Sequence, residues 1–126
     1  MNEIREATRL RRDILKHKPA PHPRHDAVVT HRARMEDIEM RLRYIPDRDI
    51  LMPNSLSDYL KAVEHGAEIS LEEMAQTILE DINDQVIPSW LEITLHRSSG
   101  HTKHDVRIED RQPHWQDRGL LDRLEP

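Results

Sequence analysis

The chain has 126 residues, of which 36% are hydrophobic and 34% charged, and its net charge is −5. This length accommodates one domain with one core. That core is thin, because the sequence contains only two Trp, two Tyr and no Phe, so we expect a homo-oligomer in which subunits complete one another. The absence of Cys excludes disulfides, thiolate metal sites and thiol nucleophiles. No apolar run approaches the roughly 18 residues that span a bilayer, and no signal-peptide core is present, so we expect a cytoplasmic protein that does not insert in membranes.

The first 25 residues differ from the rest in charge. They carry seven Lys/Arg and three Asp/Glu, a balance of +4, whereas residues 26–126 carry a balance of −9. Helical spacing of apolar residues predicts a short helix over 2–16, and three prolines in 17–25 predict an extended linker. Because this basic arm has no aromatic residue for base stacking, we do not expect it to bind nucleic acid. It should dock on an acidic neighbour or be solvated.

Two strands are predicted at the start of the folded domain. Residues 37–46 alternate between apolar and charged side chains, which is typical of a strand with one buried face. Residues 27–35 are its natural hairpin partner. Pro46 and Pro53 bracket a turn region.

Two helices follow. The first runs over 54–66, with Asn54 or Ser55 as the N-cap and Gly66 as the stop signal. The second runs over 70–86 and ends before Pro88. Each carries one apolar stripe, so both should cover the same side of a sheet.

Two further strands complete the domain. Residues 89–97 alternate strongly, with Trp90, Glu92 and Thr94 on the face opposite to the apolar one, and residues 104–111 repeat the pattern more weakly. The remainder is an irregular tail with at most one helical turn. The order ββααββ predicts an α+β fold, an antiparallel sheet with two helices on one face. The predicted organisation is a basic arm and Pro-rich linker over 1–25, a domain over 26–112 and a tail over 113–126.

Histidine pairs are the only metal-ligand candidates. His22 and His25 lie in the linker, and His101 and His104 lie in a predicted hairpin turn with Asp105. A metal ion needs three or four converging ligands, and neither pair has an identifiable third. We therefore predict no metal site, with His101 and His104 as the better-placed pair.

Adjacent carboxylates open the second helix. Ser70 and Glu73 form a capping box, in which the Ser side chain accepts the Glu73 N–H and the Glu side chain reaches back to the Ser70 N–H. Glu72 has no part in that cap. It either balances the helix dipole or serves as a binding residue.

Several of these segments resemble a known family. "YIPDRDILMPNSLSDYL" and "EEMAQTILEDINDQVIPSWLEI" resemble the T-fold (tunnelling-fold) nitrile reductases of queuosine biosynthesis, the 7-cyano-7-deazaguanine reductases, which are relatives of GTP cyclohydrolase I. The resemblance covers about residues 28–110. The matching residues are Tyr44, Pro46, Asp47, Ser55, Leu56, Tyr59, Leu60, Glu72, Asp81, Pro88, Trp90 and Glu92.

The resemblance implies a T-fold that assembles into a ring or barrel. It also implies that Glu72 is the carboxylate that grips the N–H edge of a purine-like or pterin-like molecule. A carboxylate suits this role because its two oxygens accept two parallel, charge-assisted hydrogen bonds.

Departures from the family pattern argue against nitrile reduction. The catalytic Cys of the family falls near Val29, its acid near Glu36, and the His before the binding Glu is Leu71. The NADPH motif survives only as Ser55, Leu56 and Tyr59, and Glu64 reverses a charge that would hold phosphate. We therefore expect no NADPH-dependent nitrile reductase activity, and no cofactor is predicted.

Four readings remain open. The first is a T-fold protein that binds a purine or pterin through Glu72 without reducing nitriles. The second is a non-catalytic structural or assembly subunit. The third is a T-fold enzyme with a different reaction that uses Glu36, a weak candidate for a catalytic residue, and a histidine. The fourth is a ferredoxin-like binding domain with the same element order.

Overall fold

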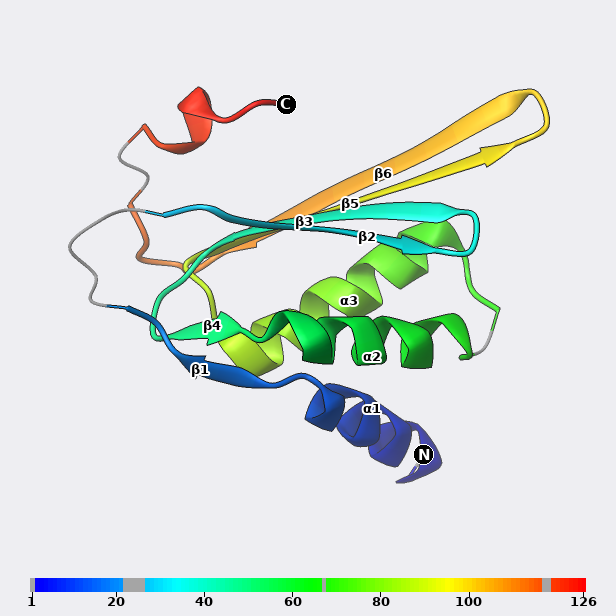
Figure 1. Ribbon diagram of the computed structural model, residues 1–126, viewed down its shortest axis with the longest axis horizontal. Helices are drawn as coiled ribbons and strands as arrows, with labels where there is room; N and C mark the ends of the chain where they lie inside the picture. Colours follow the sequence, from blue (N-terminus) through cyan, green and yellow to red (C-terminus); the bar gives the residue numbers. More distant parts are fainter. Residues whose placement is uncertain (1, 22–26, 67, 117–118) are drawn as a thin grey trace.

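The computed structural model describes residues 2–21, 27–66, 68–116 and 119–126 (Figure 1). The predicted His22 and His25 pair therefore lies outside the described residues. The elements are α1 (Asn2–Ile14), β1 (His17–Pro19), β2 (Val29–Met35), β3 (Ile38–Ile45), β4 (Asp49–Leu51), α2 (Pro53–Glu64), α3 (Leu71–Val86), β5 (Trp90–Ser99), β6 (Thr102–Arg111) and a 3₁₀ turn, η1 (Leu121–Arg123).

Four strands form one antiparallel sheet in the order β2-β3-β5-β6. Two hairpins, β2–β3 and β5–β6, are joined through the central pair β3–β5, in which Leu42 lies opposite Ile93. The second hairpin turns at Gly100, whose φ of +56° lies in the left-handed region that glycine adopts without strain. The predicted ββααββ order and antiparallel sheet are confirmed.

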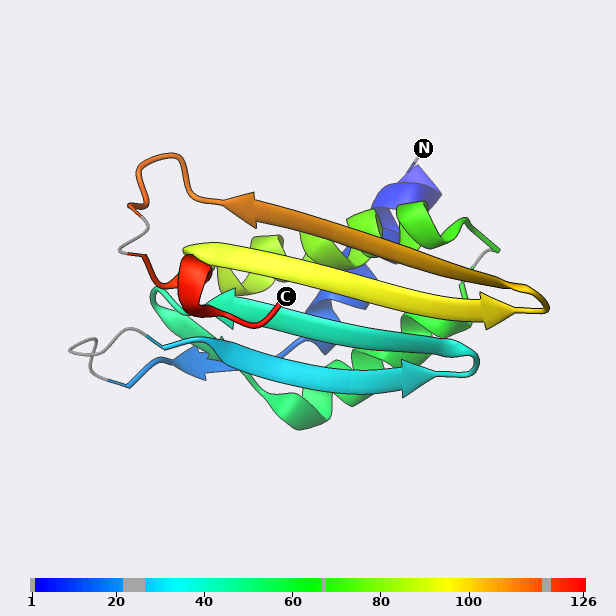
Figure 2. The ribbon, with the colours of Figure 1, turned by 90° about the horizontal axis from the view of Figure 1, so that it is seen from above.

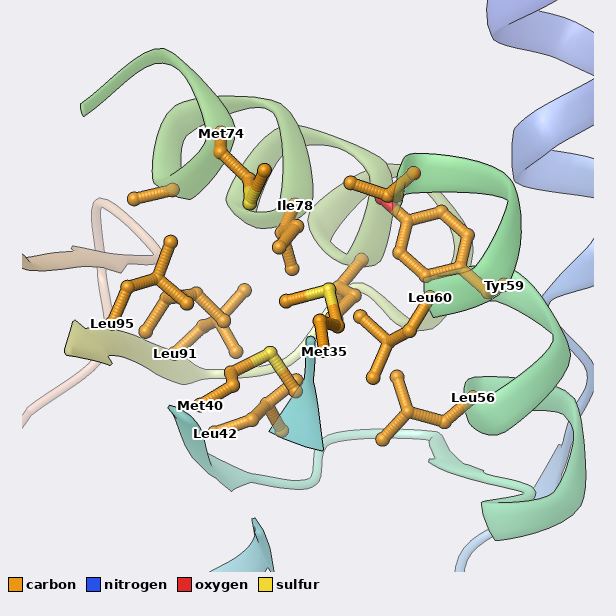
Figure 3. Packing of buried hydrophobic residues seen from close by; sticks show 14 of the residues in the cluster. Met35, Met40, Leu42, Leu56, Tyr59, Leu60, Met74, Ile78, Leu91 and Leu95 are labelled. Atoms are coloured by element: carbon orange, nitrogen blue, oxygen red, sulfur yellow. The ribbon is translucent and has the colours of Figure 1, made fainter. Parts of the chain in front are cut away.

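The core lies between the sheet and the helices α2 and α3. Side chains from one face of β3 and β5 point toward the apolar stripes of both helices (Figure 3). Every residue that the helical spacing placed on those stripes is buried. The buried stripe residues are Leu56, Tyr59, Leu60, Val63, Leu71, Met74, Ala75, Ile78, Ile82 and Val86.

The two helices begin differently. Ser70 caps α3 through the predicted capping box. The N-cap of α2 is Met52, which makes no side-chain cap, with Pro53 in the first turn. The prediction of Asn54 or Ser55 as the N-cap was wrong, because the rigid φ of proline already suits the first helical position. The Ser55 hydroxyl instead accepts a hydrogen bond from the Lys16 N–H at 2.8 Å.

The N-terminal segment packs on the helical layer. Helix α1 contacts α2 and α3 (Figure 1), and Leu15 is 2% exposed within the core cluster. Strand β1 pairs with β4 in a small second sheet, with His17 opposite Leu51. The segment between Pro46 and Pro53, predicted as a turn region, therefore contains a strand. The reason is that its partner lies more than 30 residues earlier in the chain, beyond the reach of local patterns. The division at residue 25 stays a prediction.

None of the described α-helices packs on the second face of the sheet. Trp90, Glu92 and Thr94 lie there, and the C-terminal segment (residues 119–126) crosses it above β3 and β5 (Figures 1 and 2). Trp90 donates its indole N–H to Glu109 at 2.8 Å, and the Arg43 guanidinium lies 5.9 Å from its ring centroid. None of the described helices is long and apolar enough to cross a membrane.

Candidate functional site

The first turn of α3 separates the two carboxylates that follow Ser70. The Glu73 N–H donates to Ser70 Oγ at 3.1 Å, and the Ser70 N–H donates to Glu73 Oε1 at 3.4 Å. Glu73 is thus engaged in the cap. Glu72, one residue earlier, takes no part in it.

Glu72 projects from the helix and meets a histidine of the sheet. Its side chain is 64% exposed, and its Oε1 lies 3.2 Å from Nε2 of His104 on β6. The structure therefore brings together two residues that the sequence analysis considered for different roles. His101 stays apart from this pair in the exposed β5–β6 turn. Among the residues that the structure describes, no group of three or more His, Asp and Glu is arranged to hold a metal ion.

Glu36 occupies the β2–β3 turn with a φ of 46° and is exposed. This turn lies at the same end of the molecule as the start of α3 (Figure 1). A groove of about 440 Å³ runs between this turn and the ends of α2 and α3. Glu36 and Met74 both line this groove, whereas Glu72 does not.

This end groove combines an acidic wall with apolar side chains. Its single arginine, Arg97, places Nε 3.4 Å from Asp37. The four carboxylates of the lining are Glu36, Asp37, Glu64 and Glu68, and the apolar residues are Met35, Ile38, Val63, Ile69 and Met74. Such a lining suits a flat apolar molecule that carries N–H donors.

Val29, which the resemblance matched to a catalytic Cys, is a packing residue. Val29 begins β2, lies opposite Tyr44 and packs against the core cluster. A valine side chain has no atom that can attack a nitrile carbon.

Ser55 and Tyr59, which the resemblance assigned to a cofactor motif, take part in the contacts of the N-terminal segment. Besides accepting from Lys16, the Ser55 hydroxyl donates to the Met52 carbonyl oxygen at 2.8 Å. The Tyr59 hydroxyl donates to Asp81 Oδ2 at 2.5 Å. Burial, followed by the neighbouring Asp81 charge, raises the pKa of Tyr59 well above its usual range, so this hydroxyl stays a donor.

Asp81 is the centre of a network that sequence reasoning missed. It has no exposed surface, and Arg11 Nε and Arg12 Nε lie 2.5 and 2.7 Å from its two oxygens. The basic arm therefore docks on an acidic neighbour, one of its two predicted outcomes. The available signal was an aspartate beside the apolar stripe of α3, three residues after Ile78, because a carboxylate buried there requires a positive partner.

Comparisons with known proteins found similarity at the level of solved structures. No protein-family model matches the sequence, and a search of curated proteins found no match. Among solved structures, the chain is similar to the archaeosine synthase QueF-Like, crystallised in the apo form. The identity is 20%, the match covers 75% of this chain and 91% of that chain, and the TM-score is 0.49.

Proposed function

We propose that this chain is a T-fold protein of the nitrile-reductase-like type. In this proposal it binds a purine-like or pterin-like small molecule through Glu72 and does not reduce nitriles. Two observations support the T-fold: the ββααββ order, and the placement of both helices on one face of an antiparallel sheet.

The proposal for binding rests on the Glu72 carboxylate, which is exposed and takes no part in the helix cap. The neighbouring Glu73 forms the capping box with Ser70, so Glu72 is not required to cap the N-terminus of α3. Its carboxylate remains largely exposed beside the helix N-terminus, where the N–H groups of the first turn favour negative charge. His104, at 3.2 Å, can orient this carboxylate while leaving room for N–H donors of a ligand.

The end groove is a separate surface, because Glu72 does not line it, but it suits the same class of ligand. A purine or pterin is flat and apolar on its faces, and it presents N–H groups along one edge. The four carboxylates of the groove can accept such hydrogen bonds, and its methionine and aliphatic side chains can contact a ring face.

A second candidate function is that of a structural subunit in an assembly. Strands β2 and β6 form the two edges of the main sheet, and no strand of the described residues pairs with either edge. Edge strands with free backbone groups can pair with another subunit. This candidate requires no ligand, so ligand binding distinguishes it from the first.

A thermal-shift screen of purines and pterins tests the proposal. We expect at least one compound to raise the melting temperature of the protein in a saturable manner. Glu72→Gln should weaken its binding by about 1.5–3 kcal/mol, the range for hydrogen bonds to a charged group. The melting temperature of the free protein should change little, because the capping residues are intact.

Glu73→Gln is the matched control. Glutamine also serves in a capping box, so this variant should retain both stability and ligand affinity. If no compound binds the parent protein, the binding proposal is rejected and the structural candidate is favoured. Turnover of a bound compound would instead identify an enzyme with a different reaction.

A further inference from the structure

The sheet face that points away from α2 and α3 carries a cluster of arginines around one carboxylate. Glu92 has no exposed surface. Arg43 Nε donates to Glu92 Oε1 at 2.7 Å, and Arg41 Nη2 lies 3.3 Å from the same oxygen. Arg107 Nη2 lies 2.6 Å from Oε2. Three positive charges thus surround one negative charge, and this arginine cluster retains a surplus of two.

The C-terminal segment provides the remaining acceptors. Arg43 Nη1 donates to the backbone oxygen of Glu125 at 2.6 Å, and Arg41 Nη1 donates to that of Pro126 at 2.9 Å. Figure 2 shows this segment lying over β5 and β3. The Glu125 oxygen is an uncharged peptide oxygen. It completes a hydrogen bond of Arg43 without neutralising the guanidinium.

Three buried polar atoms at the arginine cluster make no hydrogen bond, and one of them, Glu92 Oε2, still has Arg107 as its ion-pair partner. Arg41 Nε and Thr94 Oγ1 are buried without a hydrogen bond, and their residues lie opposite each other in the β3–β5 register. Thr94 is only 6% exposed. A buried polar atom without a partner is unfavourable by about 1–3 kcal/mol. Two such atoms beside surplus positive charge indicate a place where an acceptor group is missing.

A groove beside β2 reaches Arg41 of the arginine cluster. It has a volume of about 530 Å³, and Arg32, Arg34, Arg41 and His96 line it together with Glu39. Arg32 lies opposite Arg41 in the β2–β3 register. The groove is of the size that holds a small molecule.

We propose that the arginine cluster is a binding site for a small oxyanion, either a carboxylate or a phosphate group, and that the C-terminal segment closes it when no ligand is bound. Guanidinium groups bind both kinds of oxyanion with paired, charge-assisted hydrogen bonds. The ligand takes the positions of the Glu125 and Pro126 oxygens and forms charge-assisted hydrogen bonds with the arginines. This site lies on the opposite face of the sheet from the helices and is independent of Glu72.

Ligand and segment compete, so weakening the segment's attachment must favour the ligand. Leu120 and Leu124 are the half-buried apolar residues nearest to the two ends of η1. Leu124→Ala removes apolar contact and leaves the Glu125 and Pro126 backbone oxygens in place. It therefore changes the strength of closure without changing the arginines.

Calorimetric titration of the full chain with sodium phosphate and with sodium citrate, at constant ionic strength, tests the proposal. We expect saturable binding of at least one probe, and the probe that binds identifies phosphate or carboxylate as the preferred group. Leu124→Ala should bind that probe several-fold more tightly. Arg41→Gln should bind it at least tenfold more weakly. Arg9→Gln, which removes the same charge from an exposed position on α1, should bind as the parent does.

Hydrogen exchange gives a second measurement on the parent protein. A saturating probe should accelerate exchange of the amides in residues 119–126, because their segment is displaced. If Arg41→Gln does not fold, Arg41→Lys replaces it: the charge is kept, the planar fork is lost, and weaker binding is still expected. The proposal is overturned if neither probe binds the parent or Leu124→Ala, if binding survives in the Arg41 variant, or if Arg9→Gln loses as much affinity.

Discussion

At the scale of single residues, Glu92 shows how strongly a buried charge depends on its partners. Its carboxylate is enclosed by the guanidinium groups of Arg41, Arg43 and Arg107. Glu92→Gln leaves these arginines without their counter-charge, and the loss of one partner in a buried ion pair typically costs about 3–5 kcal/mol. We expect that decrease in the free energy of unfolding at pH 7, measured by urea denaturation. Glu39→Gln, at an exposed position of the same sheet face, should cost less than about 1 kcal/mol.

The effect of Glu92→Gln on the free energy of unfolding should also depend on pH. Burial alone would raise the pKa of Glu92, but the Arg43 hydrogen bond and the charges of the three arginines outweigh it, so that pKa lies below its ordinary value. A carboxyl with a lowered pKa stabilises the folded state above the unfolded-state value of about 4.3. This contribution is lost as the pH falls through the lower folded-state value. The difference between parent and Glu92→Gln should therefore shrink below about pH 4. A difference that stays constant from pH 7 to pH 3 would contradict this account.

At the scale of elements, the position of α1 depends on Asp81. Two arginines of α1 and Tyr59 of α2 all bind this one carboxylate of α3. Asp81→Asn removes the charge that holds both arginines. We expect faster hydrogen exchange throughout α1 and a loss of about 3–5 kcal/mol in the free energy of unfolding.

Asp84→Asn is the matched control for that substitution. Asp84 is 48% exposed and lies 3.4 Å from Arg12, so its ion pair is screened by solvent. Its removal should cost about 1 kcal/mol or less and leave α1 protected from exchange. Equal effects of the two variants would show that α1 is held by apolar contacts alone.

At the scale of the whole molecule, the chain should lack nitrile reductase activity. Covalent nitrile chemistry requires an activated thiolate, and the sequence has no Cys. With 7-cyano-7-deazaguanine and NADPH, the purified protein should oxidise no NADPH above background in a spectrophotometric assay. Clear turnover would overturn this prediction.

The assembly prediction belongs to the same scale. The unpaired edges of β2 and β6 offer backbone donors and acceptors to a neighbouring subunit, and a ring or barrel would remove both edges. We expect sedimentation velocity to show a homo-oligomer at micromolar concentration. A stable folded monomer under those conditions would rule out the predicted ring.

The sequence by itself was sufficient for the elements whose causes are local. Alternation along 38–44 and 91–95 predicted the central strands, and the apolar stripes of α2 and α3 predicted their buried faces. The capping box at Ser70 and Glu73 was predicted with its atoms, because both partners lie within one helical turn. The order of these elements then predicted an antiparallel sheet with helices on one side.

The tertiary structure alone decided the contacts between distant segments. Asp81 meets Arg11 and Arg12 across about 70 residues, and Arg41 and Arg43 meet the C-terminal segment across more than 80. Glu72 and His104, and likewise β1 and β4, pair across about 30 residues. Helical and strand periods report which face of an element is buried, but they do not say which charged residue from another part of the chain meets it there. Those pairings follow from how the packed layers bring separate segments together, and so the fold was predictable while the charged clusters within it were not.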